Sequence, residues 1–432
     1  MLSGWGNYPR VEARLLGARG RAETLTAVSA EASLIARGKG RSYGDAALNK
    51  AATLSMLPSN RMLDFDEASG RLTCEAGVTL AEILDIFVPR GWFVPVTPGT
   101  KFVTIGGMIA SDVHGKNHHG AGSFGEHVDS IDLALADGSI VTCSRTQDPD
   151  LFAATCGGMG LTGVILSATF RLIPIESPFI RQETLRAANL AEAVAILERS
   201  AHWTYSVAWI DCLARGDALG RSVIFLGEHA KRDEARDSRM KKKPALAVPF
   251  DAPSWALNRH TVSAFNALYY GIDRPRSAIV PYEPYFYPLD AILDWNRLYG
   301  RAGFLQYQCV LPRASALAGM QTLLERVSRS GRASFLSVLK QFGAQDGMLS
   351  FPMEGLTLAL DFAVDQQVLS LLDELDDIVA DHGGRIYLAK DARWGAKHLR
   401  QGYPRLDEFQ TIRRRVDPAG KFSSLLSQRL GL

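Results

Sequence analysis

A run of 17 residues, Asp112 to Val128 (DVHGKNHHGAGSFGEHV), gathers side chains that can do chemistry. It holds four of the chain's nine histidines, four glycines, one lysine and two acids. A zinc site prefers histidines at helical or turn spacing together with carboxylate or thiolate ligands. His114, His118 and His119 have no such partner on a clear helix, and Lys116 among them repels a cation. The pattern predicts no metal and favours the wall of a pocket for an anionic ligand, with a solvated loop as the alternative.

A second group of polar residues interrupts apolar segments late in the chain. Gln306, Lys340, Asp361 and Lys390 each lie within or beside a segment with the pattern of a strand. A single lysine in a strand usually lies at an edge or extends its charge to water. Several in one region are better explained by a polar cleft for a phosphorylated or polyhydroxylated substrate. A lysine that is partly desolvated there has a lowered pKa and can act as a base.

Three glycine-rich stretches are suited to contact phosphate. They are Ala36–Ala46 (ARGKGRSYGDA), Pro98–Gly125 with seven glycines in 28 residues, and Gly157–Gly163 (GGMGLTG). Glycine lets the backbone pass close to a phosphate and point its N–H groups at it. No Walker loop occurs, and the first stretch is a poor Rossmann fingerprint. Three loops in one region predict one extended ligand with phosphate. A short helix after Thr104 is expected to direct its first amides at a pyrophosphate.

The elements that must position these residues change in character near residue 176. Before it, short strands and turns prevail, with a capping box at 79–82 that opens a helix to about Val88 and a hairpin turn at Asp137-Gly138. After it, helices are predicted at 190–200, 314–328 and 366–381 between strands. Residues 244–290 are rich in proline and are predicted to be irregular. The tail is predicted to hold one strand, 385–389, and two short helices.

The composition excludes several classes of protein. A chain of 432 residues with 47% apolar content predicts two domains, and a net charge of +2 gives no nucleic-acid footprint. Five cysteines without a CxxC pattern predict reduced thiols in the core. No apolar run reaches the roughly 18 residues of a membrane span, and the first residues lack the apolar segment of a signal peptide. We expect a cytoplasmic protein or one peripheral at the inner membrane; the periplasmic face stays open.

One segment, 231–257, is first basic and then apolar and broken by prolines. A solvated loop is the simplest interpretation. The alternative is a peripheral contact with anionic lipid or with a lipid-linked substrate.

Together these motifs resemble the flavoprotein oxidases of the vanillyl-alcohol-oxidase class, which have a p-cresol-methylhydroxylase-type FAD-binding domain. Over nearly the whole chain the sequence is more similar still to the decaprenylphosphoryl-β-D-ribose 2′-oxidase family, and the similarity is weakest at about 214–285. The segments that carry it are RSYGD (41–45), HGKNHHGAGSFGEHV (114–128), GGMGLTG (157–163), DWNRLYGRAGFLQYQ (294–308), YLAKDAR (387–393), YPRLDEF (403–409) and RRRVDP (413–418).

The resemblance implies an α+β protein with a two-domain p-cresol-methylhydroxylase-type fold. An antiparallel-sheet substrate domain, 177–384, is then inserted between two parts of the FAD-binding domain, 1–176 and 385–432. The implied activity is FAD-dependent oxidation of the ribose 2′-hydroxyl of a polyprenyl-phosphoryl-β-D-ribose to the 2′-keto sugar. An NAD(P)H-dependent reductase partner would convert that product to the arabinose form, a precursor of cell-wall arabinan. The alternatives are an FAD-dependent oxidase of a soluble sugar, alditol or aldonolactone, and a flavin-binding protein without turnover.

The resemblance also implies the site residues. Lys390 or His114 is the candidate base, while Tyr43 and Lys340 complete the catalytic set, with Lys340 holding a phosphate or sugar oxygen. Substrate contacts are implied for Lys116, Gln306, Lys340, Asp361 and Lys390. FAD contacts are implied for Ala36, Arg37, Gly38, Lys39, Gly40, Arg41, Ser42, Tyr43, Gly44, Asp45, Ala46, Gly99, Thr104, Ile105, Gly106, Gly107, Ser111, Asp112, Val113, His114, Ile165 and Tyr387.

Two departures from these families matter. Many related sugar oxidases attach FAD through a histidine just before the serine of the first loop, where this chain has Arg41, so FAD is predicted to be non-covalent. Some ribose oxidases carry a cysteine beside the flavin, where this chain has Ala359 in the segment TLALDF (357–362). We therefore expect that no thiol is needed for the reaction. Inhibitors that capture that thiol are expected not to attach covalently.

Overall fold

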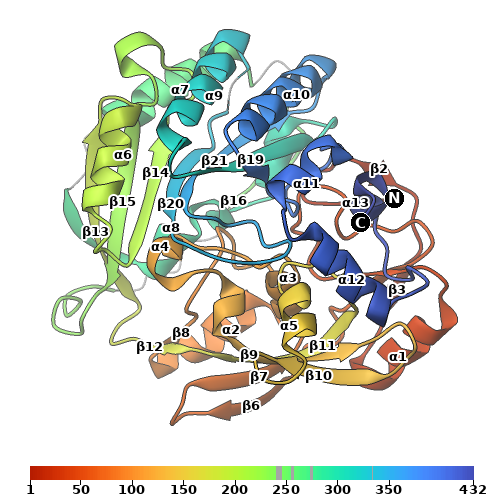
Figure 1. Ribbon diagram of the computed structural model, residues 1–432. Coiled ribbons are helices and arrows are strands. Elements are labelled where there is room, and N and C mark those ends of the chain that lie inside the picture. Colours follow the sequence, from red (N-terminus) through yellow and green to blue (C-terminus); the bar gives the residue numbers. More distant parts are fainter. Residues whose placement is uncertain (240–245, 254–256, 273–275, 333) are drawn as a thin grey trace.

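The structure is a computed structural model that describes residues 1–239, 246–253, 257–272, 276–332 and 334–432. It is a mixed fold of helices and mainly antiparallel sheets, as predicted (Figure 1). One five-stranded and one eight-stranded sheet form the two large layers. Smaller sheets pair β1 (Leu2–Ser3) with β2 (Arg10–Val11), β8 (Trp92–Phe93) with β12 (Ile173–Pro174), and β16 (Leu246–Ala247) with β18 (Ile292–Leu293).

The first region of the chain holds a small parallel sheet and the five-stranded antiparallel sheet. The parallel sheet has the order β3-β5-β4, and the antiparallel sheet has the order β10-β9-β11-β7-β6. The predicted hairpin at Asp137-Gly138 joins β9 and β10, and the predicted capping box at Thr79 and Glu82 opens α2. The elements are β3 (Leu15–Gly17), α1 (Gly20–Ala30), β4 (Ile35–Arg37), β5 (Thr53–Ser55), β6 (Met62–Asp66), β7 (Arg71–Glu75), α2 (Leu80–Phe87), α3 (Ile105–Ala110), α4 (His118–Ala121), β9 (Val128–Ala134), β10 (Ile140–Ser144), α5 (Pro149–Thr155) and β11 (Val164–Arg171).

The eight-stranded sheet spans the middle of the chain. Its order is β17-β13-β15-β14-β20-β21-β19-β22, and every pairing is antiparallel. Helices α6, α9 and α10 pack along it, as Figure 1 shows. The elements are β13 (Phe179–Ala187), α6 (Leu190–Arg199), β14 (Tyr205–Ile210), β15 (Ser222–His229), α7 (Arg259–Gly271), β17 (Ser277–Pro281), α8 (Tyr282–Phe286), β19 (Phe304–Pro312), α9 (Ala316–Ser330), β20 (Ser337–Phe342), β21 (Gly355–Ala363), α10 (Gln366–Asp381) and β22 (Arg385–Ile386).

Helix α10 shows how local sequence sets these elements. The side chain of Asp365 accepts a hydrogen bond from the Val368 backbone N–H at 2.8 Å and caps the first turn. Buried apolar residues recur every three or four positions, which places them on the face that meets the sheet. Gly383 follows the helix with φ of 72°, a left-handed conformation that glycine adopts without strain, so it ends the helix as predicted.

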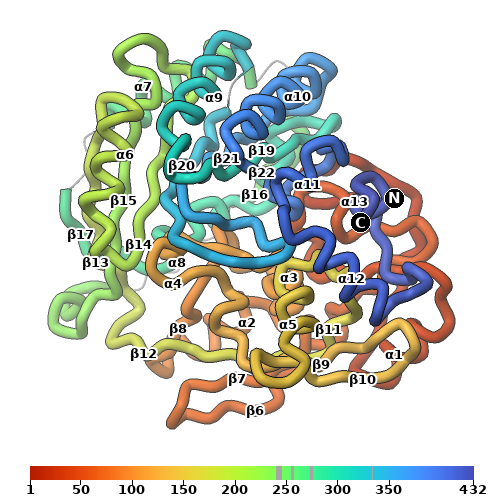
Figure 2. The backbone as a smooth tube through the Cα atoms, in the orientation of Figure 1, coloured from red at the N-terminus to blue at the C-terminus, as the bar shows by residue number. Residues whose placement is uncertain are grey.

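After the large sheet the chain returns to its first region. Leu34 forms a parallel bridge with Phe422, the Asn49 side chain donates to the Ser423 carbonyl at 2.7 Å, and the Leu425 N–H donates to the Leu48 carbonyl at 2.9 Å. The two ends of the chain accordingly lie on the same side of the molecule (Figure 2). The tail helices are α11 (Leu399–Gly402), α12 (Leu406–Val416) and α13 (Leu425–Leu430).

Three expectations about elements are wrong. The region 244–290 is not irregular throughout, because α7 and β17 lie within it; its prolines flank 254–274, which contains none. The tail holds three α-helices rather than two. The strand expected at 385–389 ends at Ile386, where the chain turns and Lys390 donates its N–H to the Tyr387 carbonyl at 3.0 Å.

In the described part of the chain, no helix is long and apolar enough to cross a membrane. Residues 240–245 and 254–256 of the basic and apolar segment, including Lys241, Lys242 and Lys243, lie outside the described residues.

Candidate active site

A cavity of about 1010 Å³ lies between the glycine-rich loops and the eight-stranded sheet. Most of the predicted site residues line it, although they come from distant parts of the chain. The sequence-predicted residues in its wall are Ala36, Arg37, Gly38, Lys39, Gly40, Arg41, Ser42, Tyr43, Ala46, Gly99, Thr104, Gly106, Gly107, Ser111, Val113, His114, Lys116, Ile165, Gln306, Lys340, Asp361, Tyr387 and Lys390.

The loop after β4 forms a cradle of backbone amides in this wall. The amides of the five residues 38–42 donate to no acceptor among the described residues. Such a run of amides without partners, exposed to a cavity, fits the oxygens of a phosphate group. A Cβ at Gly38 would overlap the Oγ1 of Thr104, so only glycine lets the loop lie this close to the start of α3. The first loop therefore fits the pyrophosphate of a dinucleotide.

Helix α3 does not offer the predicted amides to a pyrophosphate. The N–H of Ile105 donates to the Val78 carbonyl at 2.9 Å, and that of Gly106 donates to the Ala76 carbonyl at 2.9 Å. The N–H of Gly107 donates to the Thr104 side chain at 3.3 Å. The first amides of the helix are therefore already satisfied.

The third glycine loop supports α3 from behind. Gly157 donates its N–H to the Ile109 carbonyl, and Met159 donates to the Ala110 carbonyl, both at 2.9 Å. Of this loop only Met159, Gly160 and Gly163 line the cavity. The three loops thus differ in role, because the first presents the unpaired amides of residues 38–42 to the cavity, whereas the third uses two of its amides to hold α3.

Four predicted FAD contacts lie outside the cavity wall. A Cβ at Gly44 would overlap the Asp391 carbonyl, and Ile105 is fully buried in the core. Asp45 pairs with Arg429 at 2.8 Å. Asp112 accepts hydrogen bonds from the Gly125 N–H at 2.9 Å and the Gln345 amide at 2.8 Å. The Asp45 and Asp112 side chains hold loops in place, since their carboxylates are directed at other residues of the protein.

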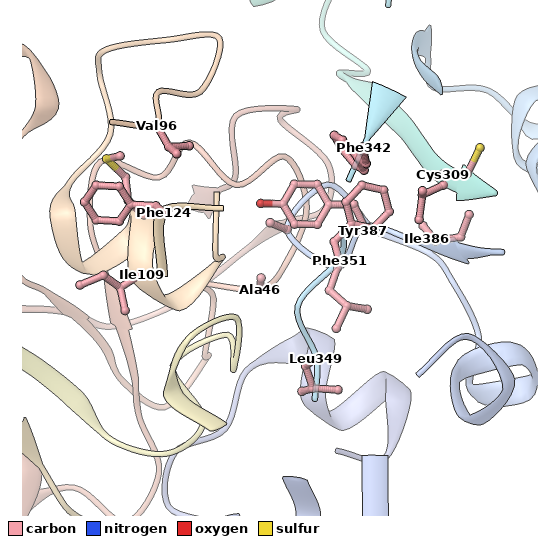
Figure 3. Close-up of a cluster of buried hydrophobic side chains, with 14 of the residues drawn as sticks. Ala46, Val96, Ile109, Phe124, Cys309, Phe342, Leu349, Phe351, Ile386 and Tyr387 are labelled. Carbon is pink, nitrogen blue, oxygen red and sulfur yellow. The ribbon is translucent and has the colours of Figure 1, made fainter. Parts of the chain in front are cut away.

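Tyr387 joins the tail of the chain to the flavin loops. Its hydroxyl donates to the Ser111 carbonyl at 2.8 Å, and its ring stacks on Phe351 with centroids 4.6 Å apart. In Figure 3 its hydroxyl oxygen points away from Cys309 and toward the side of Phe124 and Ile109. The contact anchors the segment that carries Lys390.

Polar side chains on adjacent strands form the opposite wall. Gln306 of β19 is paired with Asp361 of β21, and its side-chain amide donates to Asp361 Oδ1 at 2.7 Å. Asp361 Oδ2 has no hydrogen-bond partner among the described residues. Burial raises the pKa of Asp361 to about 7. Lys340 lies on β20, which pairs with β21, and burial lowers its pKa to about 8.

Lys390 lies where the two walls meet. Its Nζ is 4.0 Å from the centroid of the Tyr43 ring, and the Tyr43 N–H donates to the Ala389 carbonyl at 3.0 Å. Burial lowers the pKa of Lys390 to about 7; Asp361 opposes that shift and Lys340 adds to it. A large fraction of Lys390 is therefore neutral near pH 7, the state that a base requires. Burial raises the pKa of Tyr43, which stays protonated.

His114 and Lys116 complete this end of the cavity. The Gln308 side-chain amide donates to His114 Nε2 at 3.0 Å, which leaves the proton on Nδ1, and Nδ1 has no hydrogen-bond partner among the described residues. Burial and the nearby Lys340 lower the pKa of His114, so its ring is neutral. Burial lowers the pKa of Lys116 to about 7, and its Nζ donates to the carbonyls of Tyr285 and Phe286.

The other three histidines of the opening run hold the loop. His118 Nε2 lies 2.6 Å from Gln345 Oε1, His119 Nε2 lies 2.9 Å from the Trp203 carbonyl, and His127 Nε2 lies 2.9 Å from the Ala121 carbonyl. Burial lowers the pKa of His118 to about 4. Across the described residues, no group of three or more histidine, cysteine, aspartate or glutamate side chains is arranged to hold a metal ion.

Sequence reasoning missed two parts of the site. The Arg41 guanidinium lies 3.7 Å from the centroid of the Trp5 ring, and Trp5 lines the cavity. Arg429 bridges Asp45 and Asp391 beneath the Lys390 segment, at 2.8 Å to each. No local pattern marks Trp5 or Arg429. In the sequence, the charged pair Lys390-Asp391 interrupts an apolar segment. That interruption is a signal for the part of the site that Arg429 holds together.

The amide cradle, the cavity and the buried lysines fit a dinucleotide cofactor beside a polar substrate, and comparisons with known proteins identify the class as FAD-binding oxidoreductases. A family profile described as an FAD binding domain matches residues 22–144, and one described as D-arabinono-1,4-lactone oxidase matches residues 346–430. A decaprenylphosphoryl-β-D-ribose oxidase from Mycolicibacterium smegmatis is 38% identical over 449 aligned residues, which cover 100% of this chain and 97% of the relative. The chain belongs to the decaprenylphosphoryl-β-D-ribose oxidase family, as predicted.

Two further relatives mark the range of similarity. An uncharacterized protein from Streptomyces coelicolor is 36% identical over 82% of this chain and 100% of its own length. An L-gulonolactone oxidase from Mus musculus is 31% identical over only 32% of this chain and 31% of its own length. Likeness to the lactone oxidases is therefore confined to parts of the chain.

Proposed function

We propose that this enzyme oxidises the 2′-hydroxyl of a polyprenyl-phosphoryl-β-D-ribose to the 2′-keto sugar. The observation that carries the proposal is one cavity that joins the amide cradle of residues 38–42 to the buried lysines Lys116, Lys340 and Lys390. The full-length similarity to a decaprenylphosphoryl-β-D-ribose oxidase supports this choice of substrate. When bound, FAD supplies the acceptor for the two electrons of the C2′–H bond.

Lys390 is the base that we propose for the 2′-hydroxyl. With its pKa near 7, the amine has a lone pair available for the proton at neutral pH. His114 suits the role less, because its Nε2 already accepts from Gln308 and its Nδ1 carries the proton. We therefore assign His114 as a hydrogen-bond donor to a substrate oxygen. The Tyr43 ring, 4.0 Å from Lys390 Nζ, fixes the direction of the amine.

The remaining polar groups bind the sugar phosphate. Lys340 has a pKa of about 8 and keeps most of its charge at pH 7, so it suits a phosphate or sugar oxygen. In its ammonium form Lys116 has three N–H groups, of which two meet the carbonyls of Tyr285 and Phe286 and the third is available to the substrate. Asp361 Oδ2, which has no partner among the described residues, can accept from a sugar hydroxyl. These assignments use groups whose hydrogen bonds are incomplete in the protein alone.

We propose that FAD is held without a covalent bond. His114 is the one histidine in the cavity wall as far as the structure describes it, and no cysteine lines the same wall. Arg41 occupies the position where related oxidases attach FAD, and its side chain packs on Trp5. A guanidinium is a poor nucleophile, so the loop binds the cofactor through amides and charge.

We propose a division into two domains that the path of the chain supports, with β22 at its boundary still paired to β19 of the large sheet. Residues 1–176 and 385–432 form the FAD-binding domain of p-cresol-methylhydroxylase type, and 177–384 form the inserted substrate domain. The hydrogen bonds of Asn49 and Leu48 to the tail support this pairing of the two ends. We further propose an NAD(P)H-dependent reductase as the partner that takes the keto sugar, and the surface of the inner membrane as the place of action.

An anaerobic reduction experiment tests the function. The yellow holoenzyme is mixed with farnesyl-phosphoryl-β-D-ribose, and the visible band of oxidised flavin is followed. Bleaching supports the proposal. The partial match to lactone oxidases makes a soluble aldonolactone the second candidate substrate. Bleaching with an aldonolactone or a free alditol, and none with the prenyl phosphoribose, contradicts the proposal.

A further inference from the structure

The cavity continues from the buried lysines along one face of the large sheet, and this arm is mainly apolar, although Gln182 and Thr184 of β13 also line it. Val207 of β14 lies opposite Phe225 of β15, and Trp209 lies opposite Val338 of β20. These four side chains and Val280 of β17 all line the cavity. A sugar phosphate gains nothing from such a wall, whereas a hydrocarbon chain is stabilised by the apolar area that it buries there.

Helix α7 forms the outer wall of this arm. The Tyr269 ring lies 4.6 Å from the Trp209 ring, and the Phe265 ring lies 5.6 Å from Tyr269 and 5.9 Å from Phe335. Phe265 lines the cavity although 41% of it is exposed to solvent. The arm therefore reaches the surface of the molecule at Phe265.

Apolar side chains continue outward from this mouth along α7. Leu268 is 67% exposed and Ile272, directly after the helix, is 44% exposed. They follow Phe265 by three and seven positions, which places all three on one side of the helix. The opposite side is fixed to the protein, because the Asn266 amide donates to Asp211 Oδ1 at 2.7 Å. This contact therefore holds the apolar edge of α7, formed by Phe265, Leu268 and Ile272, toward solvent.

The charges around α7 suit a bilayer with anionic lipid. Its sequence from Arg259 to Gly271 contains no acidic residue. Arg259 and His260 are exposed at its start, and Arg276 is exposed beyond its end. The sequence after Ile272 reads Asp273-Arg274-Pro275-Arg276, so the segment beyond the helix carries one acid and two arginines. A helix with an apolar edge, no acids of its own and flanks of net positive charge lies in the interface between lipid headgroups and acyl chains. Figures 1 and 2 show α7 at the margin of the molecule.

We propose that α7 docks the enzyme on the membrane and that the prenyl chain enters the cavity from the bilayer past Phe265. This inference rests on the proposed function, because it is the prenyl tail of that substrate that the apolar arm takes. The bilayer contact is carried by Phe265, Leu268 and Ile272. It lies after the basic and apolar segment 231–257, on an element that the structure describes in full.

Vesicle binding tests the docking surface. The holoenzyme is sedimented with vesicles of phosphatidylglycerol and phosphatidylethanolamine, and the double variant Leu268→Ser/Ile272→Ser is compared with it. Neither residue lines the cavity. We expect vesicle affinity to fall by about tenfold in the variant, since binding scales with the apolar area inserted. The matched control is Leu317→Ser/Ile86→Ser, which alters side chains that are 44% and 39% exposed on other helices.

Activity separates this inference from the proposed function. The Leu268→Ser/Ile272→Ser variant should bleach at the wild-type rate with dissolved farnesyl-phosphoryl-β-D-ribose and more slowly with a long-chain substrate held in vesicles. Equal vesicle binding by variant and wild type, or no vesicle binding by the wild type, overturns the inference. No bleaching of the wild type by the dissolved substrate overturns the proposed function instead, whatever the vesicles show.

Discussion

Asp45 and Asp391, from opposite ends of the chain, share one guanidinium. Arg429 Nη2 lies 2.8 Å from Asp45 Oδ1, and Arg429 Nη1 lies 2.8 Å from Asp391 Oδ2. Both carboxylates are buried. Asp45 ends the loop that carries Tyr43, and Asp391 follows Lys390, so this clamp sets the separation of the candidate base and the ring beneath it.

The clamp predicts a large loss of stability for Arg429→Met. The substitution leaves two buried carboxylates without their cation, which should cost about 3–5 kcal/mol of unfolding free energy. Chemical denaturation of the holoenzyme measures it. The control is Arg415→Met, which removes an exposed pair with Asp148 at 3.1 Å between the same parts of the chain and should cost less than about 1 kcal/mol. Equal losses in the two variants would contradict the clamp.

Replacing Lys390 by methionine tests the base. Loss of a general base lowers the rate of the chemical step by about 10²–10⁴-fold. We expect flavin reduction to slow by that range in Lys390→Met while FAD stays bound, as followed by anaerobic stopped-flow absorbance. Lys397→Met is the matched control, because Lys397 is exposed and pairs with Asp377 on the surface. A rate within about twofold of wild type would remove Lys390 from the role.

The rate of flavin reduction should depend on pH near neutrality. Lys390 accepts a proton only when neutral, and its pKa is about 7, so the rate should rise between pH 6 and 8 and then level. Asp361, when ionised, raises that pKa. In Asp361→Asn the inflection should therefore move to lower pH. An inflection that stays in place, or moves upward, would mean that a different group titrates.

A single methyl group should weaken FAD binding. In Gly38→Ala the new Cβ would overlap the Thr104 side chain, which would displace the amide cradle or the start of α3. We expect FAD affinity to fall at least tenfold, because several charge-assisted hydrogen bonds depend on the position of that loop. Fluorescence titration of apoprotein measures it. Gly120→Ala is the control, since a Cβ there meets nothing within 4 Å and the residue lies outside the cavity wall.

The composition of the cavity wall predicts that the wild type and an Ala359→Cys variant differ in covalent labelling by a cysteine-directed reagent. Ala359 lines the cavity, and within the described part of that wall there is no cysteine. A cysteine-directed electrophile shaped for the pocket should leave the wild-type cavity unmodified and should add its mass to Ala359→Cys.

Acid precipitation of the wild type should release all FAD into the supernatant. Flavin in the pellet would show a covalent bond.

Much of this structure could be predicted from local sequence. The helix at 366–381 and the hairpin at Asp137-Gly138 were visible because capping and turn residues lie beside periodic apolar positions. The lysines of the site were visible because they interrupt apolar strands. Helix α7 was hidden by the prolines around it, and α1 by its weak apolar pattern, in which only Thr24 and Val28 are buried.

The sequence alone could not show which partner each polar atom bonds to in the folded protein. The three glycine loops look equivalent as strings, yet the amides of Ile105 and Gly106 are already bonded to the protein, whereas those of residues 38–42 are not. Asp45 and Asp112 look like ligand contacts by position, but their carboxylates are bonded to Arg429 and to Gln345. These differences depend on tertiary packing, which no local pattern encodes.

The bridge between Leu34 and Phe422 has a consequence for biosynthesis. The amide cradle is translated before the eight-stranded sheet, but Phe422 and helix α13, which brace the cradle, are translated after that sheet. A ribosome-bound chain therefore carries an incomplete nucleotide site until those residues emerge, and we expect FAD to be captured only from that stage on. Contacts of such long sequence separation also form slowly. The supply of flavin at that stage should therefore govern how much of the protein matures.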